Sequence, residues 1–201
     1  TDSLAGSVDL EGTPTGSFDV LTLTGNVTGK KVFMRREAGR DITGTFSLTN
    51  GLTAPSGTSR VRFNALNVGG IAFDTVGAEV RLDGAKRAAF TLGALSSNGV
   101  RLATSGDVTI GDSATNLLLR SVDIGTDSGA WSLRGPANVV LQKNDGVTID
   151  SLILANGKGG RVSVSGFVPD TGRARMLLRA DSVPLRDVGQ VAQLRRKLAG
   201  V

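Results

Sequence analysis

The chain has 201 residues, of which 39% are hydrophobic and 20% charged, and this composition is typical of a folded protein with one large all-β domain or two small ones. It contains no Cys and no His, which excludes disulfides, thiol nucleophiles, zinc sites of the usual Cys/His type and any imidazole base. The net charge of +5 suits anionic partners, but 7 Phe, one Trp and no Tyr are few aromatic residues for stacking bases, so we expect no nucleic-acid binding.

Turn signals divide almost the whole chain into short segments. Asn, Asp and Gly tolerate the positive φ angles that hairpin turns require, so segments joined by them are expected to form an antiparallel meander. A further hairpin is expected to turn at Gly39, with residues 32–36 pairing with residues 42–48. The other predicted turns are Asn50-Gly51, Asp83-Gly84, Asn98-Gly99, Gly111-Asp112, Asn144-Asp145-Gly146, Asn156-Gly157 and Asp170-Thr171-Gly172.

Between these turns, apolar and polar residues alternate with a period of two. In the longest such run, from Val100 to Ile110, every second residue is small or apolar, which places those side chains on one face of a strand and not on one face of a helix. Leu117 and Leu119 have the opposite parity to Val122 and Ile124. A β-bulge between the two pairs would restore a common face, so the sequence predicts one there.

The last segment differs from the rest. Helical spacing relates Leu185, Val188, either Val191 or Ala192, and Leu198. Pro184 suits a first helical turn, and the basic run Arg195-Arg196-Lys197 suits a last one. The sequence therefore predicts β-structure over residues 1–183 and a short amphipathic helix over residues 184–199. We expect the chain to be an internal segment of a longer protein.

The alternation predicts a sheet with one aliphatic face. About a dozen strands are too many for a flat open layer. A barrel or sandwich would bury that face completely, whereas a long curled sheet would leave it as an apolar groove. The residues expected to line such a groove are Val61, Phe63, Val80, Leu82, Val100, Leu102, Val108, Ile110, Leu117, Leu119, Trp131, Leu133, Val147, Ile149, Val162 and Val164.

Several motifs carry a resemblance to a known family. They are the opening run Leu4-Ala5-Gly6-Ser7-Val8-Asp9-Leu10-Glu11-Gly12, then Ala130-Trp131-Ser132-Leu133, Pro136-Ala137-Asn138-Val139, Val147-Thr148-Ile149-Asp150-Ser151-Leu152, Val162-Ser163-Val164-Ser165-Gly166 and residues 178–185. In these motifs the chain resembles the TamB and AsmA-like (translocation and assembly module) envelope proteins. The resemblance covers most of the chain as a pattern of strands.

The resemblance implies a β-taco, which is a long U-shaped antiparallel sheet with an apolar inner groove. It implies a periplasmic protein, anchored in the inner membrane, that conducts phospholipid to the outer membrane of a double-membraned bacterium. TamB itself is also implicated in outer-membrane protein assembly with an Omp85-type barrel, which would be a partner of regions outside this segment. The alternative hypothesis is a structural β-solenoid or β-sandwich repeat of a bacterial surface protein.

The sequence predicts neither a catalytic residue nor a cofactor. Its carboxylates show no paired arrangement of the kind a glycosidase needs, and calcium-binding repeats of the Gly-Gly-x-Gly-x-Asp type are absent, so we expect a protein that is not an enzyme and binds no metal. Trp131 either lines the groove or fills a core or the contact between helix and sheet. The basic cluster of Lys30, Lys31, Arg35 and Arg36 is expected on an exposed hairpin.

Overall fold

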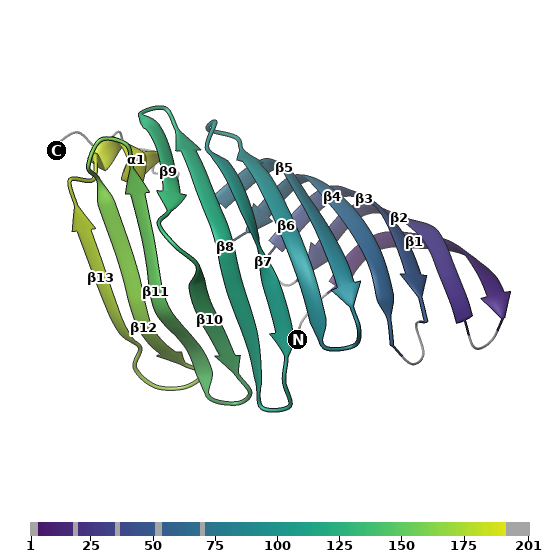
Figure 1. The fold of residues 1–201 in the computed structure, drawn as a ribbon. Coiled ribbons are helices and arrows are strands. Elements are labelled where there is room, and N and C mark those ends of the chain that lie inside the picture. The colour runs from purple at the N-terminus through teal and green to yellow at the C-terminus, as the bar shows by residue number, and fades with distance from the viewer. Residues whose placement is uncertain (1–3, 18–19, 35–36, 51–53, 69–70, 192–201) are drawn as a thin grey trace. The chain divides into compact units, whose positions relative to one another are not determined.

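The computed structural model describes residues 4–17, 20–34, 37–50, 54–68 and 71–191, and nearly all of them lie in β-strands (Figure 1). The strands are paired antiparallel with their neighbours, and one short helix follows the last of them. The predicted class, an all-β antiparallel fold with a short C-terminal helix, is therefore confirmed. Residues 1–97 and 98–201 form two compact units. The single β-segment over residues 1–183 stays a prediction.

Each unit is an antiparallel meander in which strands pair in chain order, with one exception at β9. In the second unit β9 and β10 share the position between β8 and β11, so that β9 pairs with both of these strands beyond the end of β10. The first unit contains β1 (Leu4–Ser17), β2 (Val20–Met34), β3 (Glu37–Thr49), β4 (Ser56–Val68), β5 (Ile71–Asp83) and β6 (Arg87–Ser96). The second contains β7 (Arg101–Ile110), β8 (Ala114–Thr126), β9 (Gly129–Leu133), β10 (Ala137–Gln142), β11 (Gly146–Asn156), β12 (Arg161–Pro169), β13 (Arg175–Asp181) and α1 (Leu185–Val191).

Except at Gly39, the predicted turns lie where one strand ends and the next begins, as expected, and Gly51 lies outside the described residues. Asn50 and Asn144 adopt φ angles of 55° and 63°, in the left-handed region that these residues tolerate. The turn predicted at Gly39 is wrong, because Val32 pairs with Gly39 and Met34 pairs with Glu37. Gly39 is therefore a strand residue. The predicted helix, residues 184–199, is observed as α1, and residues 192–199 lie outside the described residues.

Cross-strand pairing gathers the apolar residues of the first unit on one face. Residues directly opposite one another in a sheet point to the same side, so a row of paired residues reports the character of that face. One row across the unit consists of Leu10, Val27, Gly44, Val61, Ala78 and Leu92. The next row consists of Glu11, Asn26, Thr45, Arg60, Glu79 and Thr91. The sheet therefore has an aliphatic face and a Thr-rich, charged face.

Two bulges maintain the same division in the second unit. In β8, Ser121 pairs with Ser105 and Leu119 with Gly106, which leaves Arg120 as an extra residue and confirms the predicted bulge. In β11, a register shift between Ile149 and Leu152 has the same effect. The resulting apolar row is Val108, Leu117, Val139, Ile149, Gly166 and Met176.

Glycines in mid-strand allow close packing on the apolar face. A Cβ added at Gly25 would lie 2.1 Å from the Glu11 carbonyl oxygen and 2.6 Å from Cζ of Phe46, whereas one added at Gly77 in β5 would meet nothing within 4 Å. The Phe46 ring thus covers the backbone at Gly25, which shields a position that has no side chain of its own.

We expect Gly25→Ala to lower the free energy of unfolding by about 1–3 kcal/mol, since backbone and ring must both shift. The matched change Gly77→Ala is expected to be neutral or to stabilise by about 0.5 kcal/mol, because it only restricts the unfolded chain. Urea unfolding measures both changes. Equal destabilisation by the two substitutions would show that the contact with Phe46 is not what constrains Gly25.

Candidate functional site

The apolar faces are not sealed into a core. Among the described residues the buried hydrophobic side chains are Val76, Trp131 and Ala137, and no large side chain is fully buried. A closed sandwich or barrel would bury an aliphatic face completely, and this burial is not observed in the described part of either unit.

The apolar face is nevertheless more sheltered than the opposite one. Along β6, Phe90 and Leu92 are half-buried while their neighbours Ala89 and Thr91 are exposed. Aliphatic side chains on the adjacent strand β5 shelter Phe90 and Leu92, because each lies directly opposite another residue of the same face. On the outermost strand β1 the shelter is lost, and Leu10 is 67% exposed. The aliphatic face is therefore continuous within each unit and accessible to solvent.

Within each unit the structure brings the predicted lining residues together. Every one of them that lies in a strand occupies the apolar face of its unit, and Val100 immediately precedes β7. The prediction omitted other residues of the same face, which share the alternation and were visible in the sequence. These are Val27, Ile42, Phe46, Val76, Phe90, Leu92, Ile124, Val139, Leu152, Leu154 and Leu178.

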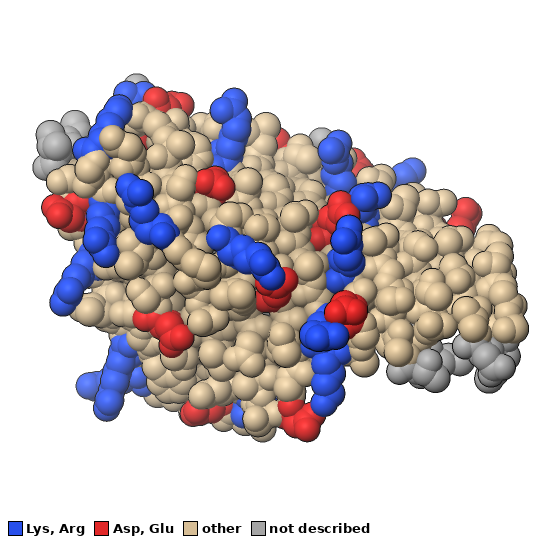
Figure 2. All heavy atoms as spheres, in the orientation of Figure 1, with Lys and Arg blue, Asp and Glu red and all other residues tan. Residues whose placement is uncertain are grey.

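The opposite face carries the charges. Arg60 and Glu79 form a two-pronged ion pair with N–O distances of 2.9 and 3.1 Å, and Arg120 pairs with Asp107. The hydrogen bond from Arg60 holds the pKa of Glu79 below its ordinary value, and the same bond raises the pKa of Arg60. Figure 2 shows basic and acidic side chains scattered over the visible surface. An open depression of about 700 Å³ lies between Arg60, Arg62 and the surrounding threonines.

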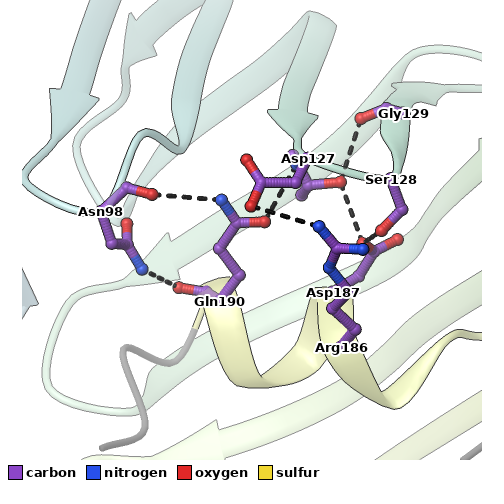
Figure 3. Close-up of polar contacts among 8 residues, drawn as sticks. Asn98, Asp127, Ser128, Gly129, Arg186, Asp187 and Gln190 are labelled. Atoms are coloured by element: carbon purple, nitrogen blue, oxygen red, sulfur yellow. Dashed lines mark hydrogen bonds and ion pairs between the residues drawn. The ribbon is translucent and has the colours of Figure 1, made fainter. Parts of the chain in front are cut away.

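Helix α1 is fixed at one end of the second unit by a buried carboxylate. Asp187 is 3% exposed and accepts a hydrogen bond from Nε1 of Trp131 at 2.9 Å. It also accepts one from the hydroxyl of Ser128, which Figure 3 shows, and Oγ1 of Thr126 lies 3.0 Å away. Gln190 reaches the Asp127 amide through Oε1 at 3.0 Å. The helix therefore docks on the sheet through polar contacts.

These hydrogen bonds favour the ionised form of Asp187. Burial of the carboxyl group raises its pKa, but the hydrogen bonds from Ser128, Trp131 and Thr126 and the charge of Arg186 outweigh burial, so the pKa of Asp187 lies below its ordinary value. Arg186 also pairs with Asp127 at 3.5 Å. The group is therefore an ionised carboxylate at neutral pH.

The docking mode leaves the apolar side of α1 exposed. Leu185, Val188 and Val191 are 40%, 43% and 39% exposed, although an amphipathic helix usually buries such a stripe against its sheet.

Trp131, at 5% exposure, is the contact between helix and sheet. Of the two roles considered for this residue, the contact role is the one its surroundings show. The open part of the apolar face therefore lies away from Trp131.

Two acidic residues of the second unit, Asp107 and Asp123, are held by neighbouring side chains. The described residues contain no group of three or more acidic side chains placed to hold a metal ion. Asp107 is paired with Arg120, and Asp123 accepts a hydrogen bond from Ser132 at 2.7 Å. No helix among the described residues is long and apolar enough to cross a membrane. The basic run at residues 195–197 lies outside the described residues.

The fold and this face define an antiparallel β-protein with one continuous, unsealed aliphatic surface per unit. No protein-family model matches the sequence, and neither a curated protein nor a solved structure is significantly similar to the chain.

Proposed function

We propose that the chain is a non-catalytic segment of a lipid-conducting envelope protein, whose apolar face holds phospholipid acyl chains. The observation that carries this proposal is the aliphatic face that is not sealed in the described part of either unit, where Val76, Trp131 and Ala137 are the buried hydrophobic residues. Large exposed apolar surfaces on a folded protein mark the binding of other apolar molecules. The resemblance to the TamB and AsmA-like proteins supports the same function.

The energetics of acyl chains suit such a face. Burying one methylene group gains about 0.8 kcal/mol, so a sixteen-carbon chain gains on the order of 10 kcal/mol on any surface that shields it from water. A conducting surface must match this gain without adding specific contacts that would trap the lipid. Half-buried aliphatic residues such as Val61 and Leu92 meet that requirement, because they offer contact without polar anchors. The charged headgroup would stay in water.

The proposed setting follows from the resemblance. The chain would belong to a periplasmic bridge between the inner and outer membranes, with the inner-membrane anchor and any contact to an Omp85-type barrel located in other regions of the protein. The structural-repeat hypothesis requires a closed core. The absence of such a core in the described part of each unit favours lipid binding.

A pair of adjacent positions in β6 tests the proposal. A photo-crosslinking amino acid at Leu92, on the apolar face, is expected to label phospholipid in cells, because its side chain would lie against the acyl chains. The same amino acid at Thr91, on the polar face, is expected to label several-fold less. Lipid extraction and mass spectrometry of the crosslinked protein give the result. Equal labelling at both positions would contradict a lipid path on the apolar face.

A further inference from the structure

Strand β13 is an open sheet edge. In the described structure it pairs with β12 on one side and ends the strand order of its unit. All seven of its residues are exposed, including Met176 at 41%, Leu177 at 50% and Leu178 at 67%. An edge of this kind presents unpaired backbone N–H and C=O groups to any strand that can match its side chains.

The sequence of β13 matches itself. It reads Arg-Met-Leu-Leu-Arg-Ala-Asp, with Leu178 at its centre. In an antiparallel pair centred on Leu178, that residue would face its own copy, and Met176 would face Ala180. The same register places Arg175 opposite Asp181 twice, so that opposite charges meet at both ends of the pair. Asp181 accepts a hydrogen bond from Ser182 at 3.3 Å through Oδ1, which leaves Oδ2 for an arginine.

We propose that β13 is a dimerisation edge, which pairs antiparallel with β13 of a second copy of this chain about a two-fold axis at Leu178. A two-fold axis perpendicular to the sheet keeps the apolar faces of the two second units on the same side, so Leu178 and Met176 would connect them. Such an isologous contact closes on itself and does not propagate into fibres. The proposal stands independently of what the apolar face binds.

The other outer strand lacks this match. β1 is also a sheet edge, but its charged residues are Asp9 and Glu11, both acidic. Pairing β1 with itself about Leu10 would place Asp9 opposite Glu11, and like charges directly opposite one another destabilise a strand pair. A head-to-tail contact between β13 and β1 would bring the arginines of β13 near the acidic residues of β1. Cysteine crosslinking distinguishes this contact from the two-fold pair.

A charge exchange tests the two-fold register. We expect the full chain to dimerise with a dissociation constant on the order of 10 µM, since the contact is short. Arg175→Asp should weaken the dimer at least tenfold, because it places the new carboxylate opposite Asp181 of the other copy at both ends of the strand pair. The double variant Arg175→Asp/Asp181→Arg should restore dimerisation, because the exchanged charges pair again. Sedimentation velocity measures all three, and a double variant as weak as the single one would overturn the register.

Cysteine crosslinking provides the second arm, since the natural chain contains no Cys. Leu178→Cys is expected to form a disulfide-linked dimer with itself under mild oxidation, and the substitution should leave the fold intact because the side chain is exposed. A mixture of Leu178→Cys and Leu10→Cys chains distinguishes the contacts. Crosslinking mainly between the two variants would show head-to-tail pairing, and a monomer without crosslinks would show that the edge stays free; either result overturns the proposal. Circular dichroism confirms folding, which matters for Asp181→Arg because Arg161 lies directly opposite on β12.

Discussion

Replacing Asp187 with alanine is expected to release helix α1 from the sheet. The carboxylate is 3% exposed and accepts the Trp131 indole proton at 2.9 Å, so its removal leaves a buried donor without a partner. Loss of a buried, charged hydrogen-bond acceptor costs about 2–3 kcal/mol. Trp131 is the single Trp of the chain, so the tryptophan emission comes from this one indole, which contacts Asp187. We expect its emission to move to longer wavelength in the variant.

Asp127 provides the matched control. It belongs to the same cluster, but its side chain is 60% exposed and pairs with Arg186 at 3.5 Å, so Asp127→Ala should leave the Trp131 emission close to that of the natural chain. Identical emission from all three proteins would contradict a docking role for Asp187.

Acid should reproduce the effect of the Asp187 substitution. The folded-state pKa of Asp187 lies below its ordinary value of 3.8, so its contribution to docking is complete above that value. The contribution is lost as the pH falls through the lowered pKa, because the unfolded state then binds the proton more readily. The Trp131 emission is therefore expected to stay constant from neutral pH to about 4 and to shift only below it. A shift centred near pH 6 would contradict the lowered pKa.

A charge on the apolar face is expected to weaken lipid binding strongly without unfolding the chain. Leu92→Asp would place a carboxylate among half-buried aliphatic side chains. An ionised group cannot lie against hydrocarbon without losing its hydration, so about four methylene groups would be displaced, at about 0.8 kcal/mol each. The expected loss of about 3 kcal/mol corresponds to a fall of about 100-fold in affinity for a fluorescent phospholipid.

The adjacent position again supplies the control. Thr91→Asp introduces the same charge on the exposed polar face and should change lipid affinity by less than about twofold. Because the apolar face is not sealed, the carboxylate introduced by Leu92→Asp can reach water at the margin of the face, and circular dichroism should show that this variant keeps the sheet. Equal affinity of the two variants would place lipid binding elsewhere.

The strands and their faces could be predicted because β-alternation is a local signal. The turn dipeptides and the parity change between Leu119 and Val122 predicted the hairpins and the β8 bulge. The same parity change separates Ile149 from Leu152, and the bulge in β11 could have been predicted by the same rule. The turn at Gly39 was predicted wrongly because glycine occurs both in turns and within strands. Only the observed pairing of Gly39 with Val32 shows that it is a strand residue.

The docking of α1 could not be predicted in this way. Helical spacing identified Leu185, Val188 and Val191 as an apolar stripe, and the usual expectation is that such a stripe faces the sheet. The observed orientation depends on partners of Asp187 that lie 56 to 61 residues away in the chain, at Trp131 and Thr126. A single buried carboxylate with several donors outweighs the stripe, and the sequence carries no local sign of those donors.

The most direct test of the central claim is native mass spectrometry of the chain purified without detergent. If the open apolar face holds acyl chains, the protein should carry phospholipid, seen as added mass that is released on activation and is absent from Leu92→Asp but present in Thr91→Asp. Protein that emerges lipid-free, and that takes up no phospholipid when it is incubated with vesicles, would contradict the account.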